Sequence, residues 1–112
     1  MLQTTDQVRV SKTEDRTTFI ITGEVDHHSA KRIKKLIDSE IFIGAPRNVV
    51  LDLSSVDFMD SSGLGLILGR YKISTELGIP FYLSEPAPSV MKILKISGCD
   101  RMINIIKRKK NT

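Results

Sequence analysis

The chain has 112 residues, of which 40% are hydrophobic and 27% charged, the composition of one globular domain with one core. This length leaves no room for separate substrate and cofactor domains, and no apolar run has the length of a membrane span or the layout of an export signal. The single cysteine, Cys99, cannot form an internal disulfide. We therefore expect a cytoplasmic protein without membrane contacts, in which Cys99 is a small, partly buried side chain.

The net charge of +4 arises from 17 basic and 13 acidic residues, and four basic residues stand together in positions 107–110. Without those four, the 13 remaining basic residues balance the 13 acidic ones. Domains that bind nucleic acid spread Lys and Arg over a folded face, often with aromatic residues between them. We interpret residues 107–112 as a solvated basic tail that follows a domain of residues 1–106, and we expect no nucleic-acid partner.

The first half of the chain predicts a β-hairpin and an amphipathic helix. Residues 7–12 and 17–22 are rich in Val, Ile, Thr and Phe, and four polar residues separate them, which is typical of a hairpin. Gly23 ends the second strand, and Asp26 is a suitable N-cap for a helix that closes near Gly44 and Pro46. The apolar face of this helix comprises Ala30, Ile33, Leu36, Ile37 and Ile41.

The second half alternates strands with helices. Residues 48–53 are typical of a strand buried on both faces, and a helix follows from Asp60 or Ser61, as N-cap, to about Leu77. Residues 79–84 then predict a strand, residues 86–97 a helix ended by Gly98, and residues 101–106 a last strand.

The resulting order is β-β-α-β-α-β-α-β, an α/β domain with a mixed sheet of about five strands and three helices. The later strands run parallel, because helical crossovers connect them. Strands end and helices begin along one edge of such a sheet, so we expect Asp26 and the two serines at 61 and 62 to lie near one another there.

The second predicted helix has apolar residues on two sides. The stripe that we expect to face the sheet comprises Leu64, Ile67, Leu68 and Tyr71. The opposite stripe comprises Ser62, Leu66, Arg70, Ile73 and Leu77. Either a neighbouring helix covers part of this second stripe, or Leu66, Ile73 and Leu77 remain exposed for another protein.

The segment from Phe58 to Tyr71, where strand-type residues give way to small polar ones, does not predict an enzyme. A serine nucleophile at a strand-helix turn usually lies in Gly-x-Ser-x-Gly, but Met59 and Asp60 precede Ser61 here. His27 and His28 are the only histidines, and on a helix their side chains point about 100° apart, a poor geometry for a shared metal. We therefore expect no catalytic residues and no bound metal, and we interpret both histidines as surface residues of a helix start.

Three glycines, Gly63, Gly65 and Gly69, follow the strand at the start of the second helix. Their spacing differs from that of a dinucleotide-binding turn, and no Walker-type Gly-Lys-Ser/Thr follows. We interpret them as sites of close packing between helix and sheet and expect no cofactor, with nucleotide binding as the alternative.

A hydroxyl group at a helix N-terminus is well placed to carry a phosphate. Phosphoserine adds about −1.5 to −2 charge, which a helix N-terminus tolerates or favours. The nearby carboxylate of Asp60 would instead repel the phosphate, and an interface that covered it would lose affinity. The serine pair therefore predicts a modification that switches a complex and leaves the fold intact.

Two separated segments resemble the STAS domain of bacterial anti-sigma-factor antagonists, most closely the sporulation type. They read Gly-Glu-Val-Asp-His-His-Ser-Ala in residues 23–30, and Phe-Met-Asp-Ser-Ser-Gly-Leu-Gly in residues 58–65 followed by Ile-Leu-Gly-Arg-Tyr-Lys in residues 67–72. The resemblance covers roughly residues 8–106. It implies that Ser61 is the phosphorylation site and that Asp26 lies near it on the binding face.

The resemblance implies a binding protein, not an enzyme. In this family the unphosphorylated antagonist captures an anti-sigma factor that is also a serine kinase, the kinase switches the antagonist off, and a PP2C-type phosphatase resets it. The residues that we expect at the partner interface are Asp26, His27, Met59, Asp60, Ser62, Gly63, Leu66, Arg70 and Ile73.

We expect the free protein to be a monomer. Two functions remain as alternatives to a sporulation-type antagonist. One is a small nucleotide-binding module, and the other is the antagonist of a general stress pathway, which often has threonine where this chain has Ser62. The family usually has a final helix after its last strand, whereas residues 107–112 are too short and too charged for one. We therefore expect an exposed edge or face at the C-terminal end of the domain.

Overall fold

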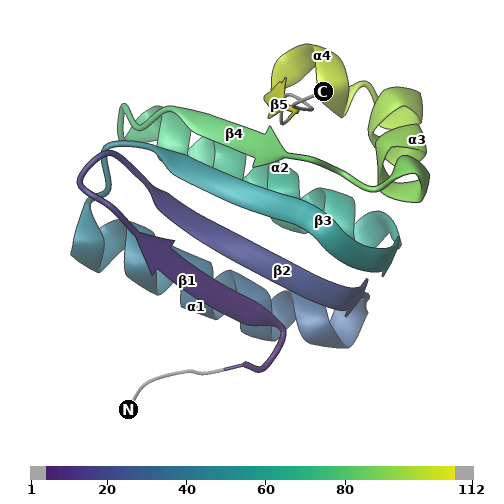
Figure 1. The fold of residues 1–112 in the computed structure, drawn as a ribbon, viewed down its shortest axis with the longest axis horizontal. Helices are drawn as coiled ribbons and strands as arrows, with labels where there is room; N and C mark the ends of the chain where they lie inside the picture. Colours follow the sequence, from purple (N-terminus) through teal and green to yellow (C-terminus); the bar gives the residue numbers. More distant parts are fainter. Residues whose placement is uncertain (1–4, 108–112) are drawn as a thin grey trace, which may run out of the picture.

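The computed structural model describes residues 5–107, and within that range it contains five strands and four helices (Figure 1). In chain order the elements are β1 (Val8–Lys12), β2 (Thr17–Val25), α1 (His27–Gly44), β3 (Val49–Met59), α2 (Ser61–Glu76), β4 (Phe81–Ser84), α3 (Pro88–Ser97), α4 (Cys99–Met102) and β5 (Asn104–Ile106). The predicted tail lies outside the described residues apart from Lys107.

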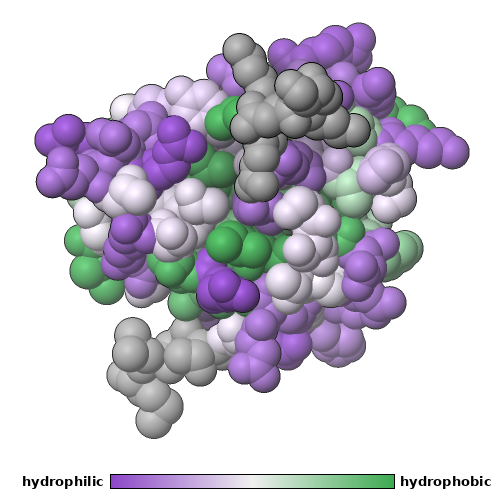
Figure 2. Space-filling view, viewed as in Figure 1, coloured by the Kyte–Doolittle hydropathy of each residue, from purple (hydrophilic) through white to green (hydrophobic). Residues whose placement is uncertain are grey.

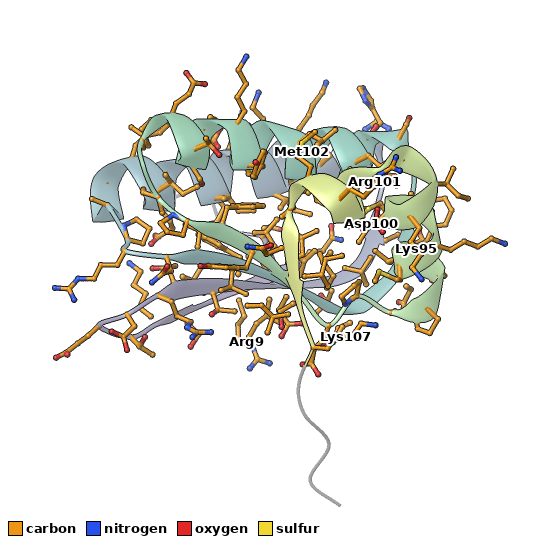
Figure 3. The ribbon with its side chains drawn as sticks, turned by 90° about the horizontal axis from the view of Figure 1, so that it is seen from above. Arg9, Lys95, Asp100, Arg101, Met102 and Lys107 are labelled. Carbon is orange, nitrogen blue, oxygen red and sulfur yellow. The ribbon has the colours of Figure 1, made fainter. Side chains whose placement is uncertain are left out.

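The five strands form one sheet in the order β1-β2-β3-β4-β5, with β1 antiparallel to β2 and all other pairs parallel. This confirms the predicted α/β fold, its hairpin and its mixed sheet. Helices α1 and α2 lie side by side on one face of the sheet, while α3 and α4 lie beyond β4 (Figures 1 and 3). In the described part of the chain β5 pairs with β4 alone, so it forms an edge of the sheet.

The core lies between the sheet and its helical layer. Phe19, Leu51 and Leu83 stand in register on three adjacent strands, and each is 0% exposed. Helix α1 adds its predicted apolar face, of which Ile33, Ile37 and Ile41 are buried. The amphipathic pattern therefore places α1 correctly, because the apolar residues that recur at helical spacing gather on one face.

The opposite face of the sheet has a mixed surface, where hydrophilic and hydrophobic side chains lie interspersed (Figure 2). Val50 is only 3% exposed even though it belongs to the set of residues that alternates with Leu51 toward this face. Thr18 and Tyr82 flank it in register on the neighbouring strands. The expectation that residues 48–53 form a strand buried on both faces therefore holds for Val49, Val50 and Leu51.

Two strands extend beyond the predicted ends. Strand β2 continues through Gly23, which adopts a φ of 78°, and its pairing with β3 shifts register at Gly23/Glu24. Strand β3 continues to Met59, although exposed polar residues interrupt its apolar run at Ser54 and Ser55. Backbone pairing between the two strands outweighs the weak local strand preference of these polar segments. As a result, β2 and β3 end together.

The C-terminal part differs from the sequence-based prediction by one additional helix. Helix α3 begins at Pro88 instead of Pro86 and ends at Gly98, whose φ of 83° is left-handed. Residues 99–102 then form the short helix α4 in place of the start of the predicted last strand. Burial explains this helical turn, because Cys99 and Ile103 are 2% and 1% exposed and Ile103 N donates to Cys99 O at 2.9 Å.

Candidate functional site

Two helix starts meet at one edge of the sheet. Val25 and Met59 are paired at the ends of β2 and β3, and Asp60 N donates to Val25 O at 3.3 Å. The next residues of the two segments, Asp26 and Asp60, are the N-caps of α1 and α2. This confirms the expectation that Asp26 and the serine pair lie near one another.

The Asp26 side chain is fixed in a reciprocal capping arrangement. Its Oδ1 accepts from Ser29 N at 2.9 Å and from His28 N at 3.1 Å, while Asp26 N donates to Ser29 Oγ at 2.9 Å. These hydrogen bonds, led by that of the Ser29 backbone, hold the pKa of Asp26 below its ordinary value. Asp26 therefore presents a fixed negative charge at neutral pH.

Asp60 has the same role at the start of α2. Its Oδ1 accepts from Ser62 N at 2.8 Å, which settles the N-cap alternative in favour of Asp60 and makes Ser61 the first residue of the helix. Ser61 is exposed and Ser62 is half-buried. An accessible hydroxyl group therefore lies at the positive end of the α2 dipole, beside a fixed carboxylate.

Met59 and Gly63 flank the sequence Asp60-Ser61-Ser62, and their contact sets the position of α2. Met59 is 2% exposed, and Gly63 is also buried. A Cβ atom at Gly63 would overlap the Cγ atom of Met59, so the close approach requires glycine. Both residues were predicted to lie at the partner interface, and in the free protein tight packing of α2 against the end of β3 buries them.

The buried arc of α2 falls between the two predicted stripes. It comprises Gly63, Leu66, Ile67, Arg70 and Ser74. The helix packs against both the sheet and α1, so the residues that face the corner between them are the most buried. Of the two alternatives, coverage by a neighbouring helix therefore holds.

The alternative in which Leu66 remains exposed does not hold, since this residue is 5% exposed. Ile73 is half-buried, and Leu77, at the end of the helix, is 49% exposed. Leu68 was assigned to the sheet-facing stripe, yet it is 36% exposed. The reason is again the position of α2 in a corner, which turns the helix away from the orientation that either stripe alone suggests.

Arg70 joins α2 to α1 through an ion pair. Its Nε lies 2.7 Å from Asp38 Oδ1, and the two side chains are 5% and 22% exposed. Loss of hydration raises the pKa of Asp38 and lowers that of Arg70, and each charge partly offsets the effect on the other. Arg70 was predicted to lie at the partner interface, and in this conformation its charge is paired with Asp38 instead.

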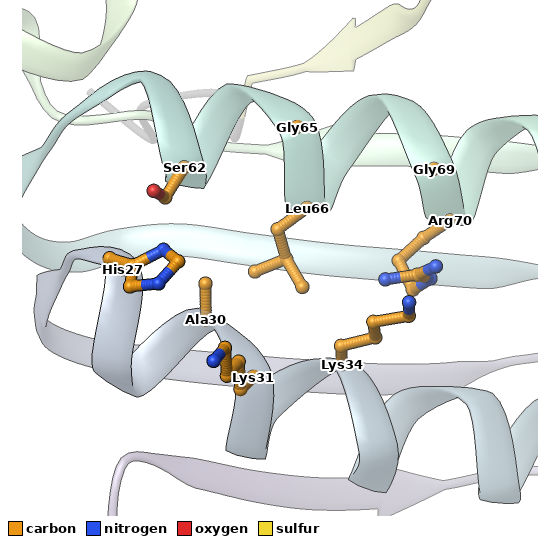
Figure 4. Close-up of a pocket in the computed structure, with 9 residues that line it drawn as sticks. All are labelled: His27, Ala30, Lys31, Lys34, Ser62, Gly65, Leu66, Gly69 and Arg70. Atoms are coloured by element: carbon orange, nitrogen blue, oxygen red, sulfur yellow. The ribbon is translucent and has the colours of Figure 1, made fainter.

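A groove of about 310 Å³ runs between α1 and α2 (Figure 4). It is lined by His27, Ala30, Lys31, Lys34, Ser62, Gly65, Leu66, Gly69 and Arg70. His27 and Ser62 lie at one end of it, whereas Lys34 and Arg70 lie toward the other (Figure 4). The structure thus brings His27 and Ser62 together at this end of the groove.

Close packing explains only one of the three glycines in α2. A Cβ atom at Gly65 or Gly69 would have no neighbouring atom within 4 Å outside the local helix backbone, in contrast to Gly63. The interpretation that all three glycines pack helix on sheet is therefore wrong for Gly65 and Gly69, which line the groove instead. Sequence spacing gave no signal of this difference, because it depends on how α2 packs against Met59 and on where α1 lies.

Residues 5–107 contain no group of three or more His, Cys, Asp or Glu side chains arranged to hold a metal ion. The rings of His27 and His28 lie edge to face, with their centroids 5.9 Å apart, at the exposed start of α1. Cys99 is buried and unpaired. None of the helices in this part of the chain is both long and apolar enough to cross a membrane.

Comparisons with known proteins agree with this geometry. Residues 7–111 match the STAS domain family. A protein of Paenibacillus polymyxa named anti-sigma F factor antagonist is 36% identical over 85 residues, which cover 76% of this chain and 73% of the relative.

Two solved structures of the anti-sigma factor antagonist SpoIIAA are also similar. The unphosphorylated form is 29% identical, with a TM-score of 0.79, over 92% of this chain and 89% of the other. The phosphorylated form, from Bacillus, is 28% identical, with a TM-score of 0.74, over 92% of each chain. The sheet edge with its paired aspartate caps and exposed serine thus belongs to a chain that is a member of the STAS domain family.

Proposed function

We propose that this protein is an anti-sigma-factor antagonist whose binding is switched by phosphorylation of Ser61. The observation that carries the proposal is an exposed serine at the first position of α2, on the same sheet edge as two aspartates held in place as helix caps. The names of the similar proteins support it, and one of them was solved in a phosphorylated form.

The physical effect of the phosphate differs for the fold and for the complex. On the free protein, the added charge lies in water at the helix N-terminus, where the dipole favours it. In a complex, the same charge would be buried beside the carboxylates of Asp26 and Asp60. A penalty of about 3 kcal/mol would lower the affinity about a hundredfold.

The partner in this proposal is an anti-sigma factor that is also a serine kinase, and a PP2C-type phosphatase restores the free serine. The antagonist itself is a cytoplasmic, non-enzymatic monomer that releases a sporulation sigma factor. Its contact surface comprises Asp26, His27, Asp60, Ser61 and Ser62, with the half-buried Ile73 further along α2. Met59, Gly63, Leu66 and Arg70 support this surface from below.

Phosphosite mapping tests the proposal directly. The protein is incubated with ATP and the anti-sigma factor of the same organism, and the modified residue is identified by mass spectrometry. We expect one phosphate on Ser61, none on the Ser61→Ala variant, and normal modification of Ser62→Ala as the matched control. Phosphate on another residue, or continued modification of Ser61→Ala, would contradict the proposal.

A further inference from the structure

The groove between α1 and α2 is open because two helix positions lack side chains. Gly65 and Gly69 lie within α2, not at a turn, and an added Cβ atom at either position would have free space around it. Gly63 shows the contrasting case, in which a side chain cannot fit. The helix therefore has room for larger residues at positions 65 and 69, and glycine there leaves an accessible hollow.

The lining of the groove combines an apolar floor with positive charge. Leu66 and Ala30 extend toward each other from the two helices, and the side chains of Lys31 and Lys34 border them (Figure 4). Arg70 is already paired with Asp38. None of the nine lining residues is acidic.

The charge of Lys31 and Lys34 is not matched by a close carboxylate. Within residues 5–107, neither lysine has an acidic oxygen within ion-pair distance. Lys34 lies near enough to Asp38 to contribute to lowering the pKa of that carboxyl, but Asp38 makes its ion pair with Arg70. The groove therefore has a positive rim that is free to meet negative charge.

We propose that this groove binds an acidic, amphipathic segment of the same protein partner that covers Ser61. An apolar side chain of that segment packs on Leu66, in the space beside Gly65 and Gly69, and its carboxylates face Lys31 and Lys34. This inference rests on the proposed function. Two observations support this occupant: the charge complementarity, and the continuity of the groove with the switch surface through His27 and Ser62.

The distribution of polar groups fits a protein segment better than a small enclosed ligand. Small-molecule sites bury most of their ligand and place a few polar groups inside an apolar cavity. Here both lysines are exposed, and the buried lining residues are Leu66 and Arg70, of which Arg70 is already paired. The groove thus offers one shallow apolar contact with charges around it, as at the rim of a protein interface.

Two substitutions alter the groove without touching the serine pair. Gly69→Leu fills the hollow, and Lys31→Glu reverses one charge at its rim. Thr75→Leu on α2 and Lys95→Glu on α3 are matched controls, since both residues are exposed and neither lines the groove. Dissociation constants for the anti-sigma factor of the same organism are measured by calorimetry, and thermal unfolding checks each fold.

We expect each groove variant to weaken binding about tenfold and each control to leave it within about twofold of the wild type. The wild-type affinity should also fall as the salt concentration rises, and Lys31→Glu should make this dependence less steep. Normal binding by both groove variants, together with loss of binding by Ser61→Asp, would overturn the groove assignment and leave the proposed function standing. Failure of the wild type to bind would overturn the proposed function itself.

A second measurement does not depend on the folding of any variant. Amide chemical shifts of the ¹⁵N-labelled wild-type protein are followed as the anti-sigma factor is added. We expect shifts at Ala30, Lys34, Gly65 and Gly69 in addition to those around Ser61. Shifts confined to the switch surface would overturn the groove assignment.

Discussion

Asp26 and Asp60 each combine two roles at the start of a helix. As N-caps they accept hydrogen bonds from backbone N–H groups, which fixes both carboxylates. As charges they remain at the same sheet edge as Ser61, where a mobile acidic side chain would be free to turn away. The residues that stabilise the two helix starts are therefore also the residues that would repel a phosphate in a closed interface.

The capping role of Asp26 predicts a distinct pH dependence. We compare the wild type with Asp26→Asn, because asparagine also caps helices well and the difference between the two proteins isolates the charge. The pKa of Asp26 is lowered in the folded state, so its ionisation stabilises the fold above its ordinary value of 3.8. This contribution is lost as the pH falls below 3.8 and passes through the lowered pKa.

Urea unfolding at a series of pH values checks this prediction. The wild type should be more stable than Asp26→Asn near pH 6, and the difference should shrink in acid. Asp38 has a raised pKa, so its ionisation acts with the opposite sign, but it is present in both proteins and cancels in the comparison. A difference that stays constant with pH would show that the charge of Asp26 does not contribute.

At the scale of the element, helix α2 shows that glycine has different structural roles at different positions of one helix. Gly63 is required by contact with Met59, whereas Gly65 and Gly69 border open space. The buried arc of the helix likewise includes Arg70 and Ser74, which a hydrophobicity pattern alone would place outside. The position of α2 in the corner between sheet and α1 decides both features.

Alanine substitutions should separate the three glycines of α2. Gly65→Ala and Gly69→Ala should each raise the free energy of unfolding by roughly 0.5–1 kcal/mol, since alanine is the better helix former. Gly63→Ala should lower it by about 1–3 kcal/mol, because the added methyl group overlaps Met59. Chemical denaturation measures the stability of all three variants. Destabilisation by Gly65→Ala or Gly69→Ala would contradict the open space around that position.

At the scale of the whole molecule, α1 and α2 form one layer that covers one face of the sheet (Figure 3). The ion pair between Asp38 and Arg70 links the two helices within that layer. Both charges are largely removed from water, so the pair holds the helices in register more than it adds net stability. The groove lies along the same helix pair, and its shape therefore depends on this link.

Breaking the ion pair on one side should destabilise the whole domain. Arg70→Ala leaves the carboxyl of Asp38 without its partner, and we expect a loss of about 3 kcal/mol, at the lower end for buried pairs because Asp38 keeps some contact with water. The double variant Asp38→Leu/Arg70→Met should recover most of this loss. Denaturant unfolding tests both, and equal stability of Arg70→Ala and the wild type would contradict a structural role for the pair.

The sequence was sufficient for the order of the strands and the three longer helices, for the buried face of α1 and for the edge that unites Asp26 with the serine pair. Apolar periodicity and capping residues are local signals, and connection rules then fix how the later strands run. The sequence was insufficient to predict where β2 and β3 end, because backbone pairing extends both strands through polar residues. The helical turn at Cys99–Met102 was missed for a related reason, since burial of Cys99 and Ile103 favours it.

The sequence by itself determined the fold class, the family resemblance and the candidate phosphoacceptor Ser61, because motif residues and their spacing can be identified from the amino-acid sequence alone. Only the tertiary structure decided which side of α2 is buried, that Arg70 is paired with Asp38, and that Gly65 and Gly69 border a groove. The physical reason is that burial and pairing depend on a second helix, α1, that is distant in sequence. A single helix cannot reveal which neighbour will cover it.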